Sequence, residues 1–195
     1  MKTSSKLSIL LCSVAVVFAL AAVAAPRMAW AAPVTGSSNA TIAFDGGNLV
    51  LAETPTIAFG SHTIDAGTES FAATSVTPSL EISDARGTGL GWGVTVALSA
   101  FQSGEASSLQ GAVLSLNNAA VTSSGTGTAP TAESLITLPS NGTAVPVETA
   151  ALNAGLGVWD TAWLPANVSL NVPISSQSVG SHQATMTWTL TDAPA

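Results

Sequence analysis

Eight residues near the C-terminus alternate strictly between apolar and threonine side chains, and this pattern constrains the fold more than any other. The apolar set is Ala184, Met186, Trp188 and Leu190, and each of these four residues is followed by a threonine. Successive side chains of a β-strand point to opposite faces. The pattern therefore predicts a strand with one face toward a core and a threonine face toward solvent.

Further short runs of the same kind follow one another along the chain, separated by Gly, Pro, Asn and Ser. The longest spans residues 90–101 and places Trp92, Val94, Val96 and Leu98 on one face. Many short strands with frequent turn residues are typical of a β-sandwich or barrel. We predict a single all-β domain, an antiparallel β-sandwich.

Three local features are less regular than these strands. Asp45-Gly46-Gly47 has the composition of a tight turn, which predicts a hairpin between residues 41–44 and 48–51. Residues 148–163 are the one stretch that could hold a helix, and their glycines limit it to a single turn. Pro173 follows an alternating run that starts at residue 167, so that run is an edge strand or a strand end.

The N-terminus has the composition of a secretory signal peptide. Lys2 and Lys6 precede an apolar stretch, and Ala29-Trp30-Ala31 offers small residues for cleavage after residue 31. An uncleaved membrane anchor is the alternative, although the stretch is short for a span. We expect residues 1–31 to be the signal peptide, 32–43 a loose segment and 44–195 the domain of a secreted protein.

Charge becomes the dominant compositional feature once this leader is removed. The remaining chain has Arg86 as its one basic residue against eleven acidic residues, a net charge of −10, and it has no lysine and no cysteine. Nucleic-acid binding requires Lys and Arg to neutralise phosphates, and anionic membranes require the same charges. Both partner classes are excluded, and stability must come from packing without disulfides.

Catalytic constellations are lacking in the sequence. His62 and His182 are the only imidazoles, no residues have the spacing of a zinc site, and no Gly-x-Ser-x-Gly turn occurs. The eleven acids are more simply solubilising charges than a glycosidase pair. We expect no enzyme activity, no metal and no cofactor.

Four tryptophans follow the leader, and glycan-binding proteins often stack sugars on exposed aromatic rings. Trp92 and Trp188 lie on the apolar faces of alternating strands and are expected in the core. Trp159 and Trp163 lie in a glycine-rich stretch and are the candidates for exposed aromatics. The threonine face near the C-terminus is most simply a solvated sheet surface, and the alternative is a surface that binds a regular polymer.

Two motifs resemble the WxL domain, a cell-surface module of Gram-positive bacteria. The C-terminal motif is Val168–Pro173 followed by Trp188-Thr189-Leu190, with His182 where the family usually has tyrosine. The upstream motif is Asp84-Ala-Arg86-Gly87 followed by Gly91-Trp92-Gly-Val94, with Val94 in place of a leucine. The valine at position 94 leaves the strand pattern intact.

The resemblance extends from about Phe44 to the end and implies non-covalent attachment to the cell wall through peptidoglycan. It also implies association with other bacterial surface proteins of the same locus. The signature residues, which either bind ligand or pack the core, are Trp92, Val94, Trp188, Thr189 and Leu190. A second hypothesis is an assembly subunit that docks on a partner surface protein in an adhesion complex and does not bind glycan itself.

Overall fold

The computed structural model describes residues 34–192, so the expected leader lies outside the described part. The chain divides into a unit of Met1–Ile42 and a compact unit of Ala43–Ala195. Every strand of the described residues belongs to the second unit, and residues 34–48 form neither helix nor strand.

The described residues form sixteen β-strands and two 3-10 turns, and no α-helix. The first eight strands are β1 (Leu49–Glu53), β2 (Thr56–Ala58), β3 (Ser70–Ala72), β4 (Ser75–Thr77), β5 (Leu80–Asp84), β6 (Trp92–Leu98), β7 (Phe101–Ser103) and β8 (Ala106–Ser108). The remaining strands are β9 (Val113–Asn117), β10 (Ala120–Ser123), β11 (Thr131–Ala132), β12 (Leu135–Pro139), β13 (Ala144–Ala150), β14 (Gly157–Ala162), β15 (Val168–Asn171) and β16 (Met186–Thr191). The 3-10 turns are η1 (Pro165–Asn167) and η2 (Ile174–Ser176).

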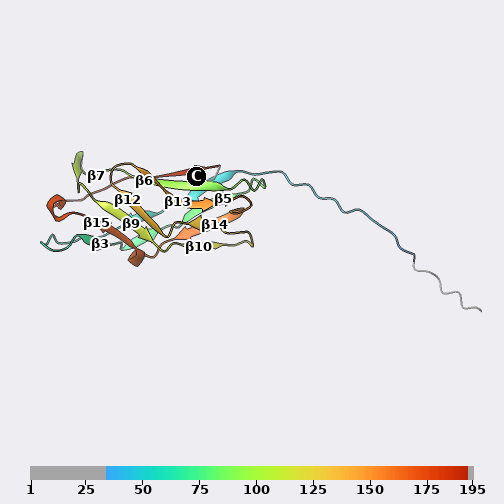
Figure 1. The fold of residues 1–195 in the computed structure, drawn as a ribbon, viewed down its shortest axis with the longest axis horizontal. Coiled ribbons are helices and arrows are strands. Elements are labelled where there is room, and N and C mark those ends of the chain that lie inside the picture. Colours follow the sequence, from blue (N-terminus) through green and yellow to red (C-terminus); the bar gives the residue numbers. More distant parts are fainter. Residues whose placement is uncertain (1–33, 193–195) are drawn as a thin grey trace, which may run out of the picture. The chain divides into compact units, whose positions relative to one another are not determined.

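Three four-stranded antiparallel sheets make up the domain, which confirms the predicted all-β sandwich. The signature sheet has the order β11-β13-β6-β16, the β9 sheet β12-β9-β15-β3, and the β5 sheet β1-β5-β14-β10. Figure 1 shows the β9 sheet toward the left and the β5 sheet toward the right. Two short pairs, β2 with β4 and β7 with β8, complete the strand pairing.

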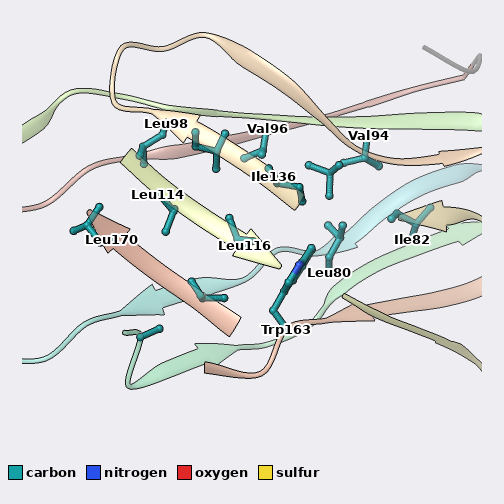
Figure 2. Close-up of a cluster of buried hydrophobic side chains, with 14 of the residues drawn as sticks. Leu80, Ile82, Val94, Val96, Leu98, Leu114, Leu116, Ile136, Trp163 and Leu170 are labelled. Atoms are coloured by element: carbon teal, nitrogen blue, oxygen red, sulfur yellow. The ribbon is translucent and has the colours of Figure 1, made fainter. Parts of the chain in front are cut away.

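The core lies where the signature sheet packs on the other two sheets. The inward side chains of β6 form one row, with Leu98 toward Leu114 and Leu170 and Val94 toward Leu80 and Ile82 (Figure 2). All of these side chains are buried. A single long strand thus contributes to both halves of one continuous core, as its alternating sequence predicts.

The hairpin prediction is wrong, and the possible helical turn is not formed. Residues 41–44 form no strand, and β1 pairs with β5, because the Gly47 N–H donates to the Ala85 carbonyl at 2.8 Å and holds the turn against the end of β5. Residues 148–163 contain no helical turn but the end of β13, a turn and β14. Pro173 lies after the end of β15, as one of the two stated alternatives expects.

Candidate functional site

The structure brings the two tryptophan motifs together on neighbouring strands. β6 and β16 pair antiparallel, so that Leu190 lies opposite Val94 and Trp188 opposite Val96. The motifs are about a hundred residues apart in sequence. Their pairing makes them one structural feature of the signature sheet.

The five signature residues differ in their exposure. Trp92 and Val94 are buried in the core, while Trp188 and Leu190 are half-buried against it. Thr189 points to the opposite face and is exposed. Of this set, only Thr189 presents its side chain on the outer surface of the sheet.

Thr189 belongs to a larger surface that we call the threonine face, the outer face of the signature sheet. Cross-strand register places Thr131, Thr149, Gly93 and Thr191 in one row, Pro146, Thr95 and Thr189 in the next, and Ala144, Ala97 and Thr187 in the third. None of these ten residues carries a charge. Except for Gly93, all are exposed or partly exposed. All three rows continue onto β16, so the threonine face extends the alternation of the C-terminal strand across the sheet.

The Trp92 side chain, on the inner face of the signature sheet, packs closely against Gly155. Its indole N–H donates to the Gly155 carbonyl at 3.1 Å. Gly155 has a φ of +71°, and a Cβ there would lie 2.5 Å from both the Trp92 Nε1 and the Ala150 Cβ. Only glycine fits at this close approach. The packing explains why a glycine-rich segment lies beside a core tryptophan.

An ion pair joins the strand ends around the same tryptophan. The Asp84 carboxylate is fully buried and accepts two hydrogen bonds from the Arg86 guanidinium, at 2.8 and 2.9 Å. Arg86 Nη2 also donates to the Gly91 carbonyl at 2.8 Å. Arg86 holds the pKa of Asp84 below its usual value, chiefly through these side-chain hydrogen bonds. The pair fixes the end of β5 to the start of β6.

The prediction that Trp159 and Trp163 are exposed aromatics is wrong. Trp159 is 4% exposed and its indole N–H donates to the Leu156 carbonyl at 3.0 Å, while Trp163 is 3% exposed. The Trp163 ring lies against that of Trp188, with centroids 6.4 Å apart. Trp159 lies on β14 and Trp163 directly follows that strand, and both side chains belong to the core. Trp92 is confirmed as core, and Trp188 is the most exposed of the four.

We expect Trp188→Ala to lower the free energy of unfolding by about 2 kcal/mol, measured by urea denaturation. A fully buried tryptophan would cost about 3–5 kcal/mol, and half-burial reduces that figure. Trp163→Ala is the matched control in the same ring pair, and it should cost more. Equal losses in the two variants would show that the exposure of Trp188 has no energetic consequence.

A carboxyl group lies in the core between two sheets. Glu148 on β13 is 1% exposed, and its Oε2 accepts a hydrogen bond from the Thr161 hydroxyl on β14 at 2.8 Å. A β-bulge between Pro146 and Glu148 turns the glutamate inward, where a regular strand would place it outward beside Pro146. Burial raises the pKa of Glu148 to about 7, and its Oε1 has no partner among the described residues.

A second surface feature is an open apolar groove of about 860 Å³. One wall is the segment of residues 56–64 that begins with β2, and the other is formed by residues 177–186 leading into β16. Its floor reaches core side chains including Leu98 and Leu114. Within the described part of the chain, no Asp, Glu, Lys or Arg lines it. Both histidines do, and the rings of His62 and Phe71 lie 4.7 Å apart.

Neither surface assembles a recognisable reactive centre. His182 bonds to the Ser108 hydroxyl at 3.0 Å and the Ser178 carbonyl at 2.9 Å, and His62 to the Phe59 carbonyl at 2.7 Å. Among residues 34–192, no three His, Cys, Asp or Glu side chains gather closely enough to hold a metal ion. The same residues contain no helix that is long and apolar enough to span a membrane.

Fold and surface together define an all-β module whose paired tryptophan strands pack a core and present an uncharged sheet face. The profile of the family described as WxL domain surface cell wall-binding matches residues 26–194. The chain therefore belongs to the WxL family, a family of cell-wall-binding surface domains and not of enzymes, and the protein is located at the cell surface. Searches of curated proteins and of solved structures returned no match.

Sequence reasoning missed most of the threonine face and all of the groove. The position of Thr95 on this face does follow from the sequence, because Thr95 alternates with Trp92, Val94 and Val96. The positions of Pro146 and Thr149 do not, because their places in this face depend on the pairing of β13 with β6. The groove depends on residues 56–64 lying opposite residues 177–186, and no local pattern in the sequence encodes that proximity.

Proposed function

We propose that this chain is a non-catalytic module held non-covalently at the cell wall through peptidoglycan, and that the threonine face is the surface that contacts the glycan. The observation that supports this proposal is the position of Thr189. Its neighbours in the signature motif, Trp188 and Leu190, are directed inward against the core, which leaves the threonine side for the ligand.

The chemistry of the face suits an uncharged polymer. Threonine hydroxyls both donate and accept hydrogen bonds, and their methyl groups offer small apolar contacts to sugar rings. Residues two apart on a strand are about 7 Å apart, and neighbouring strands are about 4.8 Å apart, so the hydroxyls repeat in two directions. A repeating array of this kind matches a repeating polymer.

The test is co-sedimentation of the secreted protein with peptidoglycan stripped of proteins and teichoic acid. The variant Thr95→Val/Thr189→Val keeps side-chain shape and β propensity but removes two hydroxyls of the face. Two lost hydrogen bonds of about 1 kcal/mol each should weaken binding by at least tenfold. Thr137→Val on β12, an exposed threonine of a different sheet, should bind as the wild type. Unchanged binding of the double variant would overturn the assignment of the face.

Salt should strengthen attachment to intact walls. Residues 32–195 carry a net charge of −10, and a wall rich in anionic teichoic acid repels them. Raising the ionic strength from low to moderate shortens the range of this repulsion, and mild acid reduces the charge. We expect the bound fraction to rise with salt in a sedimentation assay. A bound fraction that falls as salt rises would mean that ion pairs drive attachment.

Docking on a partner surface protein is the second candidate, and the groove beside β16 favours it. An exposed apolar groove next to a strand edge suits an extended segment of another protein. This candidate would be favoured by two results together. The folded protein would fail to sediment with purified peptidoglycan, and it would be retained on walls that keep their proteins.

In either case we propose that residues 1–31 are removed and that the wall-binding module begins near residue 44.

A further inference from the structure

The open edge of β16 continues one wall of the groove. The Ser99 N–H donates to the Thr185 carbonyl at 2.9 Å, and the antiparallel ladder repeats every two residues. The backbone groups of Met186, Trp188 and Leu190 are therefore directed away from β6. Among the described strands, none pairs with that side of β16. Met186 also lines the groove, so edge and groove form one surface.

The chain itself carries a segment whose pattern fits this surface. Residues 34–44 form no strand, yet Ala40, Ile42 and Phe44 alternate with Thr41 and Ala43 as in a strand. Ile42 is 79% exposed and Phe44 is 85% exposed. In an extended strand, alternate side chains lie on the same face. A strand formed by this segment could therefore insert both large apolar side chains into an apolar groove.

We propose that residues 40–44 of one molecule add as a strand to the β16 edge of a second copy and insert Ile42 and Phe44 into its groove. The added strand extends the signature sheet by one strand. It covers the groove floor, to which core side chains including Leu98 and Leu114 contribute.

Chain length excludes the molecule's own groove as the acceptor for Phe44. Gly47 is fixed to Ala85, and three residues of extended chain span about 10 Å. Ala85 lies at the Trp92 end of β6, because its neighbour Arg86 contacts Gly91, whereas the groove contains Leu98 at the opposite end. Six residues of strand separate these ends by about 20 Å. Donor and acceptor must therefore come from different copies, and where a partner does not return the contact the association builds rings or open chains.

Charge also favours a second copy as the occupant. Residues 34–44 contain no charged side chain, and no charged side chain lines the groove. Two molecules of charge −10 repel each other least where both contact surfaces are neutral. The contact is small compared with stable interfaces of about 1,600 Å², so the association is expected to be weak, in the micromolar range.

The test is sedimentation velocity on protein secreted from the full coding chain, at concentrations from about 1 to 300 μM. The wild type should form dimers and larger species as concentration rises. Phe44→Asp removes the donor, and Met186→Asp or the exposed His62→Asp blocks the acceptor, so each variant alone should stay monomeric. Val34→Asp, an equally exposed apolar position outside the alternating run, should associate as the wild type does.

Mixing the variants gives the sharpest outcome. An equimolar mixture of Phe44→Asp with His62→Asp retains one intact donor and one intact acceptor, so it should form a heterodimer that grows no further. A wild type that stays monomeric at every concentration would overturn the proposal. So would association of Phe44→Asp at the wild-type level, or a mixture that forms no dimer. The assay contains no wall material, so its outcome is independent of the proposed glycan binding.

Discussion

Replacing Arg86 by methionine is expected to lower the free energy of unfolding by about 3 kcal/mol, measured by urea denaturation at pH 7. The change leaves the buried Asp84 carboxylate without its two guanidinium hydrogen bonds and frees the Gly91 carbonyl. Breaking a buried ion pair by removing one partner costs about 3–5 kcal/mol. The lower end applies because the Arg86 side chain is 15% exposed.

A double variant separates the ion pair from simple loss of side-chain volume. Asp84→Asn/Arg86→Met removes both charges and should recover part of the loss, since no buried charge is left unpaired. The lowered pKa of Asp84 means that the pair stabilises the fold above about pH 4 and ceases to do so as pH falls through the folded pKa. A single variant as stable as the wild type would show that the pair contributes nothing.

Glu148→Gln is expected to remove a pH dependence of stability between about pH 4.5 and pH 7. The folded pKa of about 7 lies above the ordinary glutamate pKa of 4.5, so the folded state binds more protons than the unfolded state in that window. The free energy of unfolding of the wild type should therefore fall as pH rises, by about 3 kcal/mol in total, and level off above pH 7. Below pH 4.5 this contribution is fully present.

The glutamine variant should show little pH dependence from this site and should exceed the wild type in stability at pH 8, because no buried carboxylate has to be ionised. Urea midpoints measured from pH 4.5 to 8 report the difference. Glu133→Gln, in the exposed turn between β11 and β12, serves as the matched control and should retain the wild-type profile. Equal slopes for Glu148→Gln and the wild type would show that Glu148 does not titrate within the fold.

These two groups predict a domain that is most stable in mildly acidic conditions. Asp84 requires its charge and loses its stabilising contribution only in strong acid, whereas Glu148 is better accommodated when protonated. Neither group lies on the threonine face or in the groove. Their variants therefore test the fold without altering the proposed binding surfaces.

The candidate site was only partly predictable from the sequence. Alternation in β6 and β16 predicts which side chains share a face, so Trp92 in the core and Thr189 on the opposite side follow from the sequence. Alternation does not report which strands are neighbours, and the pairing of Leu190 with Val94 is what turns two separate motifs into one surface. The error at Trp159 and Trp163 has the same origin, because glycine-rich composition indicates a turn but not which way the turn faces.

The sequence by itself determined that this chain is an acidic all-β surface domain of the WxL family, because strand periodicity, charge and the tryptophan motifs are local properties. Tertiary structure alone decided the inward position of Glu148, the threonine face spread over four strands, and the groove beside β16. Each of these features depends on strand register or on contacts between segments distant in sequence. The folding free energy of the whole core determines which register and which contacts form. A bulge of a single residue in β13 is enough to exchange the inside and outside of a strand.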